Sequence, residues 1–189
     1  MTANDRSTDD AVLFEIIRER SFRRGKFRLA SGRESELYFN LKPTMMWPRG
    51  ALLAAQAFLD RIHAEQVEYI GGLEMGAVPL IGAIAAVGEA EGRPVKTFFV
   101  RKAKKEYGAQ QQVEGLADGE SLAGHKVMVL DDVATTGGSI LKAIEAARDS
   151  GAEVQTAMVI VDRDEGAKEA LAEHGVRLLS VFSGPSFLD

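Results

Sequence analysis

The chain has 189 residues, of which 46% are hydrophobic, and it carries a formal net charge of −5 at neutral pH. This length fits one domain with a sizeable core, and the composition is that of a globular protein. The acidic balance argues against a nucleic-acid-binding surface, and no stretch is long and apolar enough to span a membrane. Cysteine is absent, which excludes disulfides and thiolate metal sites. Because residues 1–10 also lack the apolar core of a signal peptide, we expect a cytoplasmic protein.

The hydrophobic pattern alternates between helix and strand along the chain. Asp9 or Asp10 is predicted to cap a first helix that ends near Gly25. The elements predicted after it are extended segments at 27–30 and 36–41, a helix at 48–65, a strand at 69–70, a helix at 77–91, a strand at 95–100, a strand at 127–130, a helix at 139–149, a strand at 154–161, a helix at 167–173 and a strand at 176–182. Repeated strand-helix units predict an α/β fold, a parallel sheet with helices on both faces. We expect a single domain over residues 1–189, with the amino-terminal segment as a small cap.

The most informative stretch is the strand at 127–130 with the turn that follows it. Asp131 and Asp132 come at the carboxyl end of this apolar strand, where open α/β sheets bind ligands. The amides of residues 135–139 and the start of the next helix are suited to bind a phosphate, and Gly137 and Gly138 allow the backbone to approach it closely.

The two acids would repel that phosphate, so we expect them to face hydroxyl groups or a divalent cation instead. A ribose with a 5-phosphate, its 2- and 3-hydroxyls turned toward the acids, meets both requirements. The alternative is that the acids only end a strand and that the threonines and serine only cap a helix.

A long polar connection follows the strand at 95–100 and runs to about Gly124. It begins with the basic run 101–105, in an otherwise acidic chain. Connections of this length in compact domains are usually disordered or form active-site lids. The basic run could be a solvated face. It could instead place cations against a departing pyrophosphate, because the preceding strand is predicted to end beside the acids.

The strand, the paired acids and the Thr-Thr-Gly turn together resemble the signature of the phosphoribosyltransferases, which implies use of 5-phosphoribosyl 1-pyrophosphate (PRPP). Residues 101–108, Arg-Lys-Ala-Lys-Lys-Glu-Tyr-Gly, resemble the loop of orotate phosphoribosyltransferases in particular. The resemblance extends in the family's order to residues 29–33, 38–40, 76–79 and 161–163.

This resemblance implies a type I phosphoribosyltransferase fold with an amino-terminal hood at about residues 1–45 and a mobile active-site loop at residues 101–119. It implies transfer of the phosphoribosyl group from PRPP to orotate, giving orotidine 5-phosphate and pyrophosphate in de novo pyrimidine (UMP) biosynthesis. It also implies Mg²⁺ as cofactor, bound through PRPP without direct protein ligands but near the paired acids. The expected assembly is a homodimer in which the loop at 101–112 acts in the neighbouring subunit's site.

The resemblance also assigns residues to roles. Catalytic roles fall to Lys105, Arg101, Asp131 and Asp132. The expected PRPP-binding residues are Arg101, Lys102, Lys105, Tyr107, Asp131, Asp132, Val133, Ala134, Thr135, Thr136, Gly137, Gly138 and Ser139. The expected orotate-binding residues are Thr135, Arg163, Tyr38 and Phe39.

The assignment of Arg163 has a chemical basis as well. Orotate differs from uracil by a carboxylate, which a guanidinium can bind through two hydrogen bonds. From the residues alone, a surface ion pair with Asp162 or Asp164 is an equal alternative. The chain departs from the family pattern at Ala30, at Met75 and at Tyr107, where relatives carry Lys, Lys and His.

Two other functions fit parts of the pattern. A phosphoribosyltransferase for another base, such as uracil or a purine, would accept a base without the carboxylate. A non-catalytic regulator that senses PRPP would need an added nucleic-acid-binding element and would not need the cationic loop.

Overall fold

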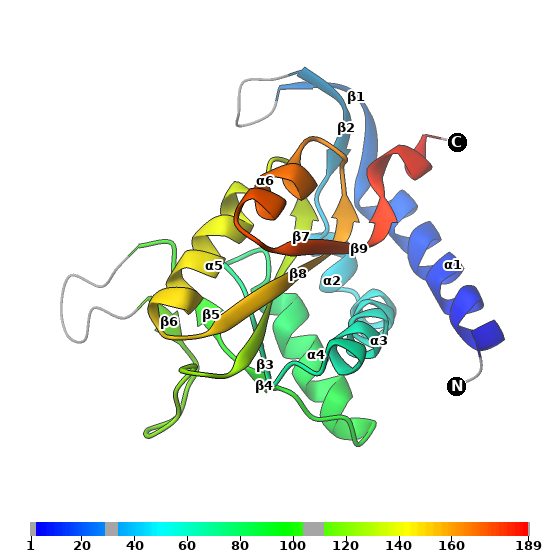
Figure 1. Cartoon of the computed structure of the whole chain (residues 1–189). Helices are drawn as coiled ribbons and strands as arrows, with labels where there is room; N and C mark the ends of the chain where they lie inside the picture. The colour runs from blue at the N-terminus through cyan, green and yellow to red at the C-terminus, as the bar shows by residue number, and fades with distance from the viewer. Residues whose placement is uncertain (1–2, 29–33, 104–111, 189) are drawn as a thin grey trace.

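The computed structural model describes residues 3–28, 34–103 and 112–188, and its centre is a five-stranded parallel sheet (Figure 1). The strand order is β4-β3-β7-β8-β9, and every neighbouring pair is parallel. The strands are β3 (Tyr69–Gly71), β4 (Lys96–Thr97), β7 (Lys126–Ala134), β8 (Glu153–Asp162) and β9 (Arg177–Ser183). The parallel α/β sheet predicted from the alternating pattern is therefore confirmed.

Helices cover both faces of this sheet (Figure 1). The elements of one face are α1 (Ala3–Arg20), α2 (Lys42–Met45), α3 (Pro48–Glu65) and α4 (Val78–Ala90), and those of the other are α5 (Gly138–Asp149) and α6 (Ala167–Glu173). Met128 and Leu130 of β7 belong to the first core cluster, whereas Val127 and Val129 belong to the second. Because alternate side chains point to opposite faces, a strand buried on both sides is apolar throughout.

The first helix differs from its prediction at both ends. It begins at Ala3, so Asp9 and Asp10 lie inside it rather than capping it, and it ends at Arg20 rather than near Gly25. The next residues form β1 (Phe22–Arg28), which pairs antiparallel with β2 (Glu34–Phe39). Phe22 packs against the rings of Phe39 and Phe187, and this tertiary contact draws the segment out of the helical pattern.

The strand predicted at 95–100 is divided in two. Its first part, β4, pairs with β3, whereas β5 (Phe99–Val100) pairs antiparallel with β6 (Val113–Glu114). β6 was not predicted from the sequence, because it is only two residues long and lies within the polar connection. A short 3-10 helix, η1 (Gly184–Phe187), follows β9 and returns Phe187 to the aromatic cluster under β1 and β2. None of the helices in the described ranges is both long and apolar enough to cross a membrane.

Gly72, which follows β3, allows a close approach between that segment and β7. A Cβ atom at Gly72 would lie 2.0 Å from the carbonyl oxygen of Leu130 and 2.6 Å from Cβ of Ala77. We expect Gly72→Ala to lower the free energy of unfolding by about 2–3 kcal/mol, because the backbone must shift to relieve the overlap. Urea denaturation measures this. The matched control is Gly82→Ala on α4, where the added methyl meets nothing within 4 Å. Equal denaturation midpoints for the two variants would contradict the packing argument.

Candidate active site

The paired acids lie near the carboxyl end of β7. The strand is longer than its apolar run predicts, because β8 continues to pair with it: Asp131 is opposite Val159 and Ala134 is opposite Asp162. The hairpin of β1 and β2 lies over this end of the sheet (Figure 1). The acids therefore lie where β7 leads into the turn before α5, at the end of the sheet that carries the hairpin.

Asp131 is nearly buried, with 6% of its surface exposed, and its two oxygens have separate partners. Oδ1 accepts a hydrogen bond from the amide of Asp132 at 2.9 Å, and Oδ2 accepts one from Oγ of Ser139, also at 2.9 Å. Burial, and then the charge of Asp132, raise the pKa of Asp131 to about 7, although the bonds from Ser139 and the Asp132 amide act in the opposite direction. Asp132 is half-buried, and its Oδ1 accepts from the amide of Val133 at 2.9 Å.

The raised pKa of Asp131 predicts a pH-dependent contribution to stability. Between 3.8, the value without the fold, and about 7, the folded chain keeps a proton on Asp131 that the unfolded chain has lost. The unfolded chain binds fewer protons in this window, so this group lowers the free energy of unfolding as the pH rises through it. At about pH 8, we expect Asp131→Asn, which cannot titrate, to be more stable than the wild type by on the order of 1–3 kcal/mol.

Chemical denaturation at about pH 4 and about pH 8 measures the effect, since the difference between variant and wild type grows only across the window. Asp149→Asn, an exposed substitution at the end of α5, is the matched control for the loss of one carboxylate. A difference in the free energy of unfolding between Asp131→Asn and wild type that stays constant with pH would contradict the raised pKa of Asp131.

Gly76 brings a second segment against both acids. A Cβ atom at this position would lie 2.7 Å from Oδ1 of Asp131 and 3.0 Å from Oδ1 of Asp132. The segment between β3 and α4 therefore forms a wall of the candidate site, and within this segment the peptide between Glu74 and Met75 is cis. Gly76 was not among the predicted site residues, although it lies in the stretch 76–79 that resembles the family. A glycine shortly after a parallel strand was the feature of the sequence that could have placed this segment in the site.

The turn from Thr135 to Ser139 leads directly into α5. Gly137, at φ +83°, is the residue before the helix, and no side chain caps the helix start. The hydroxyl of Ser139 donates to Asp131 instead. The alternative that this serine only caps the helix is therefore wrong. Thr136, Gly138 and Ser139 are exposed, whereas Thr135 is half-buried. Exposed amides at the start of a 12-residue helix are a favourable place for an anion.

Arg163 is buried beside this turn. Its amide donates to the carbonyl oxygen of Ala134 at 3.0 Å, and its Nη2 donates to the carbonyl oxygen of Leu37 in β2 at 2.8 Å. Nη2 also lies 2.7 Å from Oε1 of Glu165. The alternative of a surface ion pair with Asp162 or Asp164 is wrong: the side chain of Arg163 is 4% exposed, and Lys168 pairs with both of those acids.

The two aromatic residues predicted to bind orotate point to opposite sides of β2. Tyr38 is 41% exposed and stacks on Phe27 with ring centroids 5.1 Å apart. Phe39 is buried in the core against Phe22 and Phe187. Its side chain is thus committed to packing, and any contact with a base would come from its backbone.

The basic connection is anchored at its base. The amide of Arg101 donates to the carbonyl oxygen of Gln112 at 2.9 Å, and Nη1 of Arg101 pairs with Oε1 of Glu114 at 3.2 Å. The amide of Lys102 donates a hydrogen bond to Oε1 of Glu74 at 2.9 Å. This bond joins the start of the basic connection to the segment that contains Gly76. One strand, β3, lies between β4 and β7, so the expectation that the strand preceding the basic run ends directly beside the strand of the acids is wrong. Lys105 and Tyr107 lie outside the described residues.

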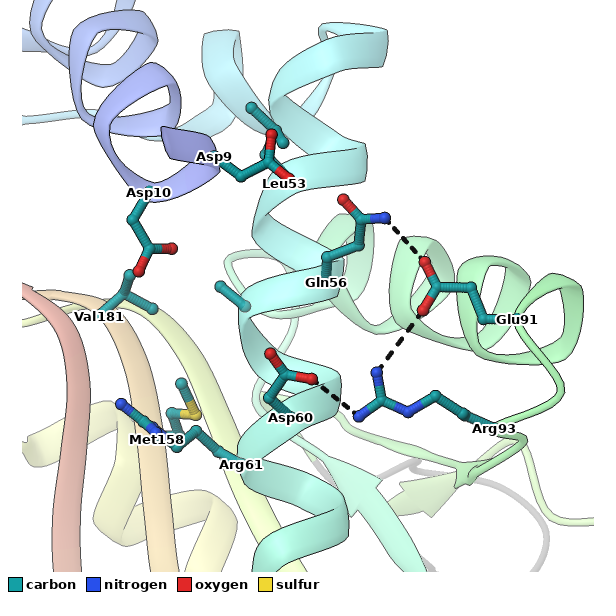
Figure 2. Close-up of a pocket in the computed structure, with 11 residues that line it drawn as sticks. Asp9, Asp10, Leu53, Gln56, Asp60, Arg61, Glu91, Arg93, Met158 and Val181 are labelled. Atoms are coloured by element: carbon teal, nitrogen blue, oxygen red, sulfur yellow. Dashed lines mark hydrogen bonds and ion pairs between the residues drawn. The ribbon is translucent and has the colours of Figure 1, made fainter. Parts of the chain in front are cut away.

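A cavity of about 650 Å³ lies elsewhere, between α1, α3 and the sheet (Figure 2). Its polar wall is held by internal contacts: Arg93 pairs with Asp60 at 3.0 Å and with Glu91 at 3.6 Å, and Gln56 donates to Glu91 at 2.7 Å. None of the residues that line it belongs to the predicted site. The cavity is therefore separate from the paired acids.

Comparisons with known proteins agree with the geometry. The phosphoribosyl transferase domain family matches residues 49–179. The chain is 53% identical over 184 residues to orotate phosphoribosyltransferase from Rhodopseudomonas palustris (strain BisB5), covering 97% of this chain and 98% of the relative. Orotate phosphoribosyltransferase of Mycobacterium tuberculosis H37Rv, solved in complex with PRPP, is 33% identical with a TM-score of 0.78, covering 96% of this chain and 99% of that one. Adenine phosphoribosyltransferase from Rhodothermus marinus, at 19% identity and a TM-score of 0.63, shares the fold.

Proposed function

Because the chain belongs to the orotate phosphoribosyltransferase family, we propose that it transfers the 5-phosphoribosyl group from PRPP to orotate, giving orotidine 5-phosphate and pyrophosphate in de novo pyrimidine biosynthesis. The observation that carries the proposal is the junction of β7 and α5. There, two acids near the end of β7 are joined by a short turn to a helix start that no side chain caps. The Mycobacterium tuberculosis relative solved with PRPP supports the same donor here.

The β7–α5 junction is suited to the two ends of a ribose phosphate. The residues whose amides and hydroxyls bind the 5-phosphate are Ala134, Thr135, Thr136, Gly137, Gly138 and Ser139, and Val133 is a further proposed PRPP contact. Asp131 and Asp132 take the ribose hydroxyls and face the positive charge that develops on the sugar carbon as pyrophosphate departs. Fixing the phosphate at a distance positions the reacting carbon, so binding energy from a non-reacting group supports catalysis.

Mg²⁺ is the proposed cofactor. The described residues contain no cluster of three or more side chains that would hold a metal ion by themselves. Asp131 and Asp132 nevertheless present hard carboxylate oxygens at the place where the PRPP hydroxyls would lie, and Mg²⁺ favours phosphate oxygens with few protein ligands. When bound through PRPP, the ion supplies charge neutralisation for the departing pyrophosphate.

The basic connection is proposed to bind the pyrophosphate through Arg101, Lys102, Lys105 and Tyr107. We place the active-site loop at residues 101–119 and the hood at about residues 1–45, within one domain over residues 1–189. The assembly is proposed to be a homodimer, in which residues 101–112 of one subunit act in the other subunit's site. A cytoplasmic location stays a prediction from composition.

Arg163 favours orotate over other bases. A buried guanidinium next to the turn is a strong partner for a carboxylate, and uracil, hypoxanthine and adenine have none. Thr135, at the start of the turn, and Tyr38, the exposed residue of β2, are the other proposed base contacts, with Phe39 contributing backbone only.

Product analysis tests the proposed reaction. Incubation of the protein with Mg²⁺, PRPP and orotate should yield orotidine 5-phosphate and pyrophosphate in equal amounts, resolved by anion-exchange chromatography. Removing the metal with a chelator should stop the reaction, and restoring Mg²⁺ should recover it. Pyrophosphate release without the nucleotide product would contradict the proposal.

A further inference from the structure

Arg163 forms a largely buried ion pair with Glu165. Nη2 of Arg163 contacts acceptors of the protein itself, the carbonyl oxygen of Leu37 at 2.8 Å and Oε1 of Glu165 at 2.7 Å. The Arg163 side chain is 4% exposed. An arginine this buried needs a counter-ion, because leaving one charge of a buried pair uncompensated is strongly destabilising.

Glu165 differs from the neighbouring acids in its surroundings. Nζ of Lys168 lies 3.0 Å from Oδ2 of Asp162 and 3.1 Å from Oδ1 of Asp164. Asp164 also accepts a hydrogen bond from Ser183 at 2.7 Å. The acids on either side of Arg163 in the chain thus share the ammonium group of Lys168. The carboxylate of Glu165, in contrast, pairs with Arg163.

The two members of the pair are unequally accessible. The side chain of Glu165 is 20% exposed, five times the fraction of Arg163. The side chain of Glu165 can therefore turn toward water with a small change in its solvation. Arg163 is held in place by the hydrogen bond from its side chain to Leu37 and by the hydrogen bond from its backbone amide to Ala134. If one partner is exchanged when a ligand arrives, it is the glutamate.

We propose that Glu165 is an exchangeable counter-ion, which the carboxylate of orotate displaces from Arg163. This inference rests on the proposed function and adds a specificity-determining residue to it. Orotate replaces one carboxylate by another, so the charge of Arg163 stays compensated throughout. A base without a carboxylate either leaves Glu165 in place or leaves Arg163 unpaired, and so gains nothing from the arginine. The same exchange makes orotate compete with Glu165.

The test is Glu165→Gln, which removes the competing charge and keeps an amide of similar size. With PRPP and Mg²⁺ saturating, we expect the KM for orotate to fall about two- to fivefold, the range for a partly exposed ion pair. The dissociation constant of orotidine 5-phosphate, which keeps the carboxylate, should fall in parallel, whereas the KM for PRPP should not change. Glu165→Ala removes the same charge without the amide and should shift the orotate KM in the same direction.

Asp164→Asn is the matched control. It removes one negative charge a single residue away, and asparagine tolerates the positive φ of 55° found there. Its KM for orotate should equal that of the wild type. If Glu165→Gln and Glu165→Ala leave the orotate KM unchanged or raise it while the wild type turns over orotate, the counter-ion role is overturned and the proposed function stands. If the wild type turns over a base without a carboxylate in place of orotate, both are overturned.

Discussion

Replacing Lys105 with alanine is expected to lower kcat by about 10²- to 10³-fold and to leave the dissociation constant of orotate nearly unchanged. The departing pyrophosphate gains charge in the transition state, and a lysine that contacts it there stabilises the transition state more than the bound substrates. Steady-state kinetics and equilibrium dialysis with orotate measure the two quantities. Lys104→Ala is the matched control, because it removes the same charge one position away, at a residue that has no proposed role in the site. Equal losses in kcat and in orotate affinity would contradict this role.

The same variant tests the proposed homodimer. Lys105→Ala and Asp132→Asn are each expected to be nearly inactive alone. If residues 101–112 act in the partner's site, a mixed dimer has one site with both defects and one intact site. After equal amounts exchange subunits, roughly a quarter of wild-type activity should return, since half of the dimers are mixed and half of their sites are intact. If the loop acts in its own subunit, mixing restores nothing.

Replacing Arg163 with alanine should have the second large effect, on the use of orotate. We expect kcat/KM for orotate to fall by about 10²- to 10³-fold, because a buried charge pair to the substrate is lost. Arg163→Lys should recover only part of it, since an ammonium cannot form the paired hydrogen bonds. The affinity for PRPP, measured by titration calorimetry, should stay at the wild-type value.

Arg163 also holds β2 through Leu37, so the fold of each variant must be checked by thermal unfolding. A variant that unfolds at the wild-type temperature and still uses orotate normally would remove Arg163 from the base site. A parallel loss of PRPP binding would show that the arginine supports the whole site instead of the base alone.

The part of the candidate site that the sequence predicts as a unit consists of neighbours in the chain. The strand β7, the acids, the turn and α5 are contiguous, and a buried parallel strand is apolar throughout. The helices α3 and α6 were also predicted, and their observed bounds match the predicted ones. Each of these elements is specified by local propensity and by the period of its apolar residues.

Other features depend on contacts between distant residues. The bond from Arg163 to Leu37 joins residues 126 positions apart, and the end of α1 is set by the packing of Phe22 on Phe39 and Phe187. The approach of Gly76 to the acids depends on how β3 lies beside β7. Periodicity in one segment contains no information on these partners, so neither the bond from Arg163 to Leu37 nor the division of the strand at 95–100 could be predicted.

The measurement that tests the central claim most directly is the loss of orotate ultraviolet absorbance after PRPP and Mg²⁺ are added to the purified protein. Uracil, hypoxanthine and adenine are followed as parallel substrates under the same conditions. We predict turnover confined to orotate. Turnover of another base would contradict the role of Arg163 in selecting a carboxylate, and tight PRPP binding without turnover of any base would contradict catalysis itself.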